Sequence, residues 1–175
     1  MLTDSNIVPE CVYGPGSFGG LMALYEGNLI KLNRLIGDIG KSVGDRYLSI
    51  GTADCDLYLT VESSVKYTQV FRMTYLFLDE DDADENRLIA DPDLCVRVYL
   101  DARLAEVAGW AAHHQHDVLK SLQRRFTREI DRRWANNMML GKWLDYLLDK
   151  GHSFRPASDL MESRDICGAA PALPG

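Results

Sequence analysis

Apolar residues early in the chain recur at helical spacing. Between Ser17 and Ile36, leucines and other apolar side chains fall three and four residues apart and form one apolar face. Ser17 is suited to cap this helix, because its hydroxyl can accept a hydrogen bond from a backbone N–H of the first turn. Gly37 and Gly40 follow, and glycine favours the left-handed conformation at which helices commonly stop. The pattern predicts a helix over residues 17–36.

The spacing then changes to an alternation of period two. In "DLYLTVES" (56–63), Leu57, Leu59 and Val61 alternate with more polar residues, which is typical of a strand with one buried face. Short connections favour antiparallel neighbours, since a parallel return needs a crossover of about a dozen residues or more. We therefore predict an antiparallel meander of five strands, over residues 47–52, 56–63, 67–78, 93–100 and 103–110.

Helical spacing returns after Trp110. Asp117 can cap a helix with one apolar side, and a second helix, or a kinked continuation, runs from about Asn136 to Lys150. Gly151 is the predicted stop. The order of elements predicts an α+β fold: an N-terminal helix, a five-stranded antiparallel sheet, and C-terminal helices packed on one sheet face. The apolar side of the first of these helices consists of Leu119, Leu122, Phe126 and Ile130.

The periodic region defines one domain with two irregular ends. Residues 1–16 contain the turn signal "YGPG" and are predicted to form a loose arm. Residues 17–152 form the single α+β domain. Residues 153–175, which end in "GAAPALPG", are predicted to be a largely disordered tail.

Composition narrows the class of protein. The net charge of −7 resides in residues 79–93, which hold eight acidic residues and one arginine, so the rest of the chain is neutral and has no general affinity for polyanions. We find no secretory signal and no apolar run approaching the roughly 20 residues of a membrane span. The four cysteines form no CxxC pair, which argues against a zinc ribbon and for reduced thiols in a cytoplasm.

Four stretches resemble the YqiB-like family of small, uncharacterised proteobacterial cytoplasmic proteins. The resemblance runs in order over roughly residues 20–152 and is weakest over 108–130. It implies no known activity. The stretches that carry it are "YEGNLIKLNRLI" (25–36), "LTVESSVKYT" (59–68), "VRVYLDARLAEV" (96–107) and "WLDYLLDKG" (143–151).

The stretch "HHQHD" (113–117) is a candidate metal site. On a helix, His113, His116 and Asp117 would offer two imidazoles and a carboxylate. A zinc site needs three or four ligands, usually with a second shell of hydrogen bonds, and His152 beside the tail is not a convincing distant ligand. We favour a polar linker over the metal site, and we expect no cofactor.

A second candidate is the positive face of residues 120–133. It could follow a phosphate backbone, with Phe126 or Trp134 stacking on bases. A solvated helix face is favoured, because Glu129 can pair with both Arg125 and Arg133. In a third interpretation this face meets the acidic residues 79–93 of the same chain or of a partner copy. The face consists of Lys120, Arg124, Arg125, Arg128 and Arg132.

The third candidate is a set of polar residues within the stretches that carry the resemblance. Asn28 falls in the apolar stripe of the first helix, where a buried amide must find hydrogen-bond partners. We expect Arg97 to lie opposite a carboxylate on an adjacent strand. In one interpretation these residues bind a ligand through their charged and phenolic groups. In the other they are structural: the charged residues form cross-strand ion pairs, and Asn28 ties the helix to the sheet. The structural interpretation is favoured. The members of the set are Asn28, Glu62, Arg97, Tyr99, Asp101 and Glu106.

These observations favour a non-catalytic binding or regulatory module that contacts a protein partner through the outer sheet face, or through the acidic segment and basic helix. The alternative is an enzyme or binder of a small phosphorylated or nucleotide-like ligand, acting through Arg97, Tyr99 and nearby carboxylates. Nucleic-acid binding through residues 120–133 comes third. The chain has no nucleophile-elbow, Walker-type, zincin or dinucleotide-binding motif. We expect no membrane contact, and a homodimer is compatible with the sequence.

Overall fold

The computed structural model describes Gly14 and residues 16–37, 42–51, 54–78, 88–110 and 128–157. In this part of the chain, two helices accompany an antiparallel sheet with the strand order β5-β4-β3-β2-β1-β6. The elements in chain order are α1 (Phe18–Ile36), β1 (Arg46–Ser49), β2 (Leu57–Val65), β3 (Thr68–Leu78), β4 (Leu88–Tyr99), β5 (Leu104–Trp110), α3 (Glu129–Asp149) and β6 (Arg155–Pro156).

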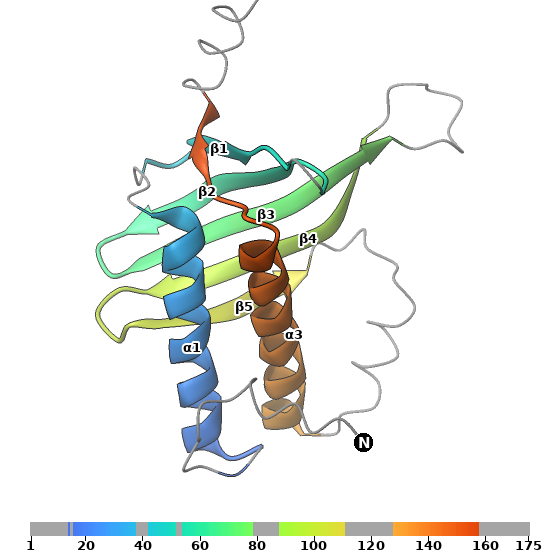
Figure 1. The fold of residues 1–175 in the computed structure, drawn as a ribbon. Coiled ribbons are helices and arrows are strands. Elements are labelled where there is room, and N and C mark those ends of the chain that lie inside the picture. Colours follow the sequence, from blue (N-terminus) through green and yellow to red (C-terminus); the bar gives the residue numbers. More distant parts are fainter. Residues whose placement is uncertain are drawn as a thin grey trace, which may run out of the picture.

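The two helices lie side by side across one face of the sheet (Figure 1), which confirms the predicted α+β class. Alternate strand residues point toward the helices and are buried, as the period-two pattern requires. Residues between them, such as Arg97 and Tyr99, point to the opposite face and are half-exposed. We call this opposite side the open face. The core lies between the helices and the sheet and includes Leu32, Leu35, Leu57, Leu59, Val61, Met73, Leu94, Val96, Val98, Leu140, Leu144 and Leu147.

The ends of α1 match the sequence prediction. The Ser17 side chain accepts a hydrogen bond from the Gly20 N–H at 3.1 Å, which satisfies one of the free donors of the first turn. Gly37 has a positive φ of 60° and its N–H bonds to the Asn33 carbonyl, so the glycine provides the helix stop.

The sheet has one strand more than the five predicted. Residues 155–156 pair with Tyr47 and Leu48 and form β6. Just before them, Phe154 is buried and its N–H donates to the Leu35 carbonyl at 3.0 Å. Residues 153–157 therefore belong to the folded unit, whereas the predicted boundary was 152. Residues 158–175 lie outside the described part of the chain.

Strand β4 begins five residues earlier than predicted, at Leu88, so residues 88–93 of the supposed acidic loop are strand. Pro92 is tolerated there because it lies at a register shift, where it has no paired residue on β3, and β5 pairs with β4 only from Leu94 onward among the described residues. Residues 79–87 lie outside the described part.

Helix α3 begins at Glu129 and not near Asn136. Glu129 and Asp131 stand in its first turn, where negative charge is favoured by the helix dipole. Ile130 belongs to α3, whereas the rest of the helix predicted after Asp117 lies outside the described residues.

A buried amide pair holds the two helices together. Asn28 of α1 donates from Nδ2 to the backbone carbonyl of Asn137 in α3, at 3.1 Å. Asn28 thus ties helix to helix, which corrects the prediction that it ties the helix to the sheet. Its Oδ1 packs against Gly141, where a Cβ would come within 2.9 Å of that oxygen. The missing side chain of Gly141 is what lets the helices approach at this point.

We predict that Gly141→Ala destabilises the protein by about 2 kcal/mol, because the new methyl group overlaps Asn28 Oδ1 and Asn28 is held by its own hydrogen bond. The matched control is Gly27→Ala in α1, where a Cβ meets nothing within 4 Å. This control should stabilise by about 0.5–1 kcal/mol through helix propensity. Urea unfolding measures both, and equal effects of the two variants would refute the close approach.

Candidate functional site

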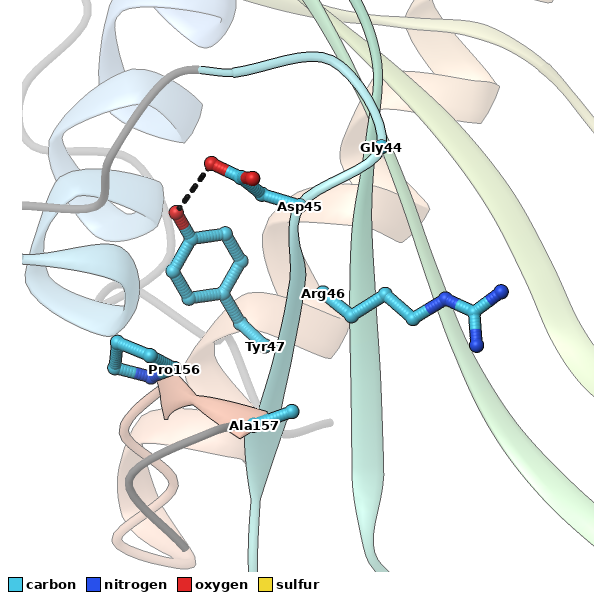
Figure 2. Close-up of a pocket in the computed structure, with 6 residues that line it drawn as sticks. All are labelled: Gly44, Asp45, Arg46, Tyr47, Pro156 and Ala157. Atoms are coloured by element: carbon cyan, nitrogen blue, oxygen red, sulfur yellow. Dashed lines mark hydrogen bonds between the residues drawn. The ribbon is translucent and has the colours of Figure 1, made fainter. Parts of the chain in front are cut away.

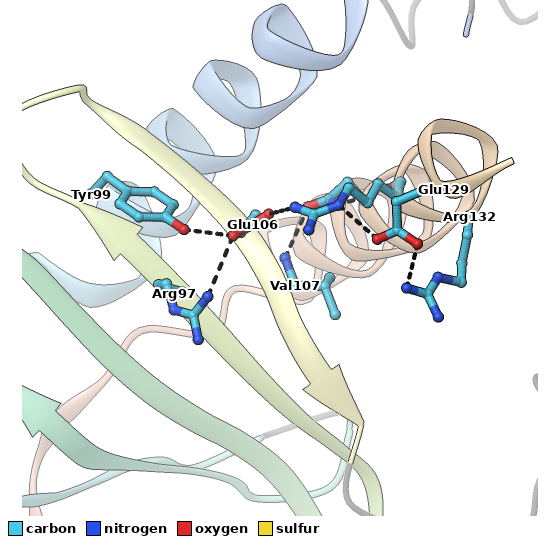
Figure 3. A network of polar contacts seen from close by, with 8 residues as sticks. Arg97, Tyr99, Glu106, Val107, Glu129 and Arg132 are labelled. Carbon is cyan, nitrogen blue, oxygen red and sulfur yellow. Dashed lines mark hydrogen bonds and ion pairs between the residues drawn. The ribbon is translucent and has the colours of Figure 1, made fainter. Parts of the chain in front are cut away.

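Three of the predicted ligand residues meet at the carboxylate of Glu106, on strand β5. The Tyr99 hydroxyl donates to Glu106 Oε1 at 2.7 Å, and Arg97 Nη1 lies 3.7 Å from the same oxygen (Figure 3). Arg97 and Glu106 are directly opposite each other in the β4–β5 register, so the strands themselves set this contact. The expected carboxylate opposite Arg97 is therefore Glu106.

The other oxygen of Glu106 faces the helix layer. Arg133 of α3 donates from Nη1 to Glu106 Oε2 at 3.0 Å and from Nε to Glu129 at 3.0 Å. The side chain of Glu106 is only 6% exposed, and a buried charge requires compensation. Arg97 from the sheet and Arg133 from the helix layer provide it. Sequence reasoning missed Arg133 as a partner of Glu106, because the two lie on elements far apart in the chain.

Tyr25 of α1 lies next to the Glu106–Arg133 ion pair. Its hydroxyl is buried and makes no hydrogen bond of standard geometry with described residues, although it lies beside Arg133 and Glu106. Burial, together with the opposing influences of Arg133 and Glu106, raises the pKa of Tyr25 to about 12. The phenol is therefore neutral at physiological pH.

A separate cluster occupies the middle of the open face. Arg72 of β3 pairs with Glu62 and, at 2.9 Å, with Asp93 Oδ2. The Cys95 thiol donates to Glu62 at 3.4 Å. Burial first, and the Glu62 carboxylate second, raise the pKa of Cys95 to about 11, so this sulfur is a neutral thiol and not a reactive thiolate.

The six predicted ligand residues thus separate into four places. Arg97, Tyr99 and Glu106 lie together, Glu62 belongs to the Arg72 cluster, and Asn28 lies between the helices. Asp101 is exposed in the β4–β5 turn, where its side chain accepts the Ala102 N–H at 2.9 Å. The sequence could place each residue on a face but could not show which faces meet.

The positive face of residues 120–133 is described only from Arg128 onward. There, each arginine has an acidic neighbour: Arg128 lies 3.9 Å from Asp131, and Arg132 pairs with Glu129 at 2.5 Å. Lys120, Arg124 and Arg125 lie outside the described residues, as do His113, His116 and Asp117. Among the residues that the structure does describe, no group of three or more potential ligands is placed to hold a metal ion.

A serine–histidine–aspartate cluster was not predicted. His152, immediately after the α3 stop, is buried with its Nδ1 2.9 Å from Ser49 Oγ and its Nε2 3.4 Å from Asp54 Oδ2. This order of groups is that of a nucleophile, a base and an orienting acid. However, Ser49 is only 2% exposed and its Oγ also accepts the Ser153 N–H at 2.9 Å.

The serine of this cluster is thus inaccessible to a substrate, and the cluster anchors the chain that leads to β6. Asp54 also accepts a hydrogen bond from Tyr75 at 3.1 Å. Burial would raise the pKa of Asp54, but hydrogen bonds from the Cys55 N–H and neighbouring side chains lower it overall. No local spacing in the sequence signals this cluster, since His152 lies about 100 residues after Ser49 and Asp54.

Comparison with known proteins places this chain in a family. A family model described as "Protein of unknown function (DUF1249)" matches residues 31–153. The chain belongs to the DUF1249 family. The match covers residues 31–36 of α1, the sheet through β5, and α3 with His152, so Glu106 and Asn137 of this DUF1249 protein fall inside it, whereas Asn28 lies before it. No curated protein and no solved structure matches the chain.

Neither helix in the described part of this DUF1249 protein is long and apolar enough to cross a membrane.

We predict that Glu106→Gln destabilises the protein by about 2 kcal/mol, because the neutral amide leaves Arg97 and Arg133 without their shared counter-charge. Glu62→Gln is the control, because its ion pair with Arg72 is more exposed and should contribute no more than about 1 kcal/mol. Chemical denaturation gives both values. An equal loss in the two variants would show that burial of Glu106 has no energetic consequence.

We also predict slow alkylation of Cys95 by iodoacetamide at pH 8, with a rate that keeps rising toward pH 11, since its pKa is raised to about 11. Glu62→Gln should shift this profile to lower pH, because the Glu62 charge contributes to the rise. Peptide mass spectrometry follows the reaction, with exposed Cys55 as the internal reference. A Cys95 rate that levels off below pH 9 would contradict the prediction.

Proposed function

We propose that this DUF1249 protein is a non-catalytic binding module that holds a protein partner at the projecting end of its β3–β4 ribbon. The observation that carries the proposal is a set of three large apolar side chains in solvent at this end: Phe77 is 42% exposed, Leu88 55% and Ile89 40%. Phe77 and Ile89 share one face of the ribbon, and Leu88 points to the other. Exposed apolar side chains grouped at one place are characteristic of interaction surfaces.

The geometry of the ribbon supports this use. Among the described residues, 76–78 of β3 pair only with 88–90 of β4, because β2 ends its pairing at Tyr75 and β5 at Leu94. A two-stranded ribbon alone is marginally stable, so a partner that buries its side chains would also stabilise its backbone. Phe77 and Ile89 are direct cross-strand neighbours and would be buried together.

The alternative, an enzyme or a binder of a small phosphorylated ligand that acts through Arg97 and Tyr99, receives less support. Both side chains already contact Glu106, so a ligand at this place would have to compete with a buried carboxylate. Nucleic-acid binding by the basic helix is likewise disfavoured by the acidic neighbours of Arg128, Arg132 and Arg133. The closer relationship to the YqiB-like proteins, and a cytoplasmic location, remain part of this proposal.

The proposal predicts that Phe77→Lys combined with Ile89→Lys abolishes capture of the partner. Tagged full-length protein and variants are incubated with lysate of the native organism, and captured proteins are quantified by mass spectrometry. The expected loss is at least about tenfold, since a charged side chain at the centre of an apolar contact leaves an unpaired buried charge.

Two further variants make this experiment specific. Ile30→Lys, at an α1 residue that is 58% exposed, is the matched control and should capture the partner normally. Val70→Lys, on the open face, tests the other surface that the sequence favoured. Loss of the partner in Val70→Lys alone would move the interface to the open face, and equal capture by all variants would refute both surfaces.

A further inference from the structure

Phe77 and Ile89 belong by register to the strand residues that face the helices. Phe77 follows Tyr75 by two residues in β3, and the centroids of the two rings are 6.1 Å apart, so both rings are on the same side of the sheet. Ile89 is directly opposite Phe77 in β4. Tyr75 is buried, whereas Phe77 and Ile89 are exposed. The helix-facing side of the sheet is therefore covered as far as Tyr75 and uncovered beyond it.

Helix α3 marks the limit of this cover. Trp143 of α3 packs edge-on against Tyr75, with ring centroids 6.0 Å apart, and is half-buried. Tyr146, one turn later on the same side of α3, is exposed. The ribbon projects past α3, and neither described helix lies over it (Figure 1). Apolar groups thus line the angle between the ribbon and α3. We call Phe77, Ile89 and Trp143 the apolar corner.

We propose that the partner docks a basic amphipathic α-helix in the apolar corner, beside α3. This inference rests on the binding function proposed above and states which element of the partner is bound. Both helices run across the strands, so the width of a helix covers a short length of strand (Figure 1). The uncovered pairs, 76–78 with 88–90, extend about 10 Å, which matches the width of one helix. The partner's helix becomes a third member of the helical layer and buries Phe77 and Ile89, whereas Leu88 lies on the opposite side of the ribbon.

Charge indicates that this helix is basic. The connection between β3 and β4 contains six acidic residues and one arginine, and it is attached to both strands of the ribbon. Such a charge attracts a positively charged partner and repels nucleic acid, an anionic membrane and a second copy of this chain. The acidic residues are Asp79, Glu80, Asp81, Asp82, Asp84 and Glu85.

The cavity at the β1–β6 edge supports a small-molecule ligand less well. Its volume is about 480 Å³, and its lining residues are Gly44, Asp45, Arg46, Tyr47, Pro156 and Ala157. Arg46 extends from one side of β1, whereas Asp45 and Tyr47 are on the other side, where the Tyr47 hydroxyl lies 3.3 Å from Asp45 Oδ2 (Figure 2). The charged groups therefore do not converge on one ligand, as a small-molecule site requires.

The test uses full-length protein and a labelled synthetic peptide of about 18 residues, in which leucine recurs every three or four positions and lysine fills the rest. Fluorescence anisotropy measures the affinity. We expect saturable binding that Phe77→Lys/Ile89→Lys weakens at least about tenfold, because charge replaces the apolar contact. Leu88→Lys is the matched control and should bind as the parent protein does.

Two control peptides test the chemistry of the partner. A peptide of the same composition, in which leucine and lysine alternate, favours a strand and should bind at least about tenfold more weakly. A helical peptide with glutamate in place of lysine should not bind. Replacement of the six acidic residues of the β3–β4 connection by asparagine and glutamine should weaken binding of the lysine peptide about tenfold at low salt and reduce its dependence on salt.

Tryptophan emission locates the bound peptide. Binding should change the emission of the parent protein. Trp143→Phe should remove this change and keep the affinity, whereas Trp134→Phe, at a residue of α3 next to Gly20, should keep both. An unchanged melting temperature of each variant shows that it is folded.

The outcomes separate this inference from the binding function. Absence of saturable binding of the helical lysine peptide, or equal affinity of the alternating peptide, overturns the helical partner. Undiminished binding by the variant without the six acidic residues overturns its basic character. Equal weakening by Leu88→Lys moves the contact away from the helix side and leaves the binding function intact. Retention of both the peptide and the lysate partner by Phe77→Lys/Ile89→Lys refutes the binding function itself. A dimer of the parent protein that this variant dissociates assigns the apolar corner to a second copy and also overturns the proposal.

Discussion

The arrangement of α1, α3 and β5 depends on one buried side chain, the amide of Asn137. Its Oδ1 accepts a hydrogen bond from the Val107 N–H of β5 at 3.0 Å, and its Nδ2 donates to the Arg133 carbonyl one turn earlier in α3. The backbone carbonyl of the same residue accepts a hydrogen bond from Asn28 Nδ2 of α1. An unpaired buried polar group costs roughly 1–3 kcal/mol, so each of these bonds penalises any sliding of one element past another. The apolar contacts around them hold the layers together without specifying their alignment.

The same corner closes an edge of the sheet. Strand β5 would otherwise present free backbone groups to other chains, and the Asn137 amide and the Glu106 ion pairs cover part of that edge with α3. Arg97, Tyr99 and Glu106, which the sequence offered as ligand residues, therefore contact one another as part of this edge. At the far edge, β6 has only two residues, and among the described residues neither Arg46 nor Arg155 has an ion pair. The two edges therefore differ in how their charges are compensated.

Much of the fold follows from local patterns. The α1 cap, the stops at Gly37 and Gly151 and the inward alternation of Leu57, Val96 and Val98 each depend on residues close in sequence, and the structure has all of these, whereas Gly40 lies outside the described residues. The errors concern elements whose stability comes from distant contacts. Strand β6 forms because Phe154 enters the core and His152 contacts Ser49, and neither contact leaves a periodic signal. Asn137 could have been found from the sequence, because it lies three residues before Leu140 on the apolar face of α3. Asn28 likewise lies on the apolar face of α1.

The sequence by itself determined the class of fold, the face on which each strand residue lies and the core position of Asn28, because side-chain direction follows directly from the helical and strand periods. Only the tertiary structure decided which charged groups meet. The pairing of Glu106 with Arg133, separated by 27 residues, depends on where α3 crosses the edge of β5. Whether an arginine is paired, as Arg97 is, or has no ion pair among the described residues, as Arg46, follows from such long-range placement and from no spacing in the chain.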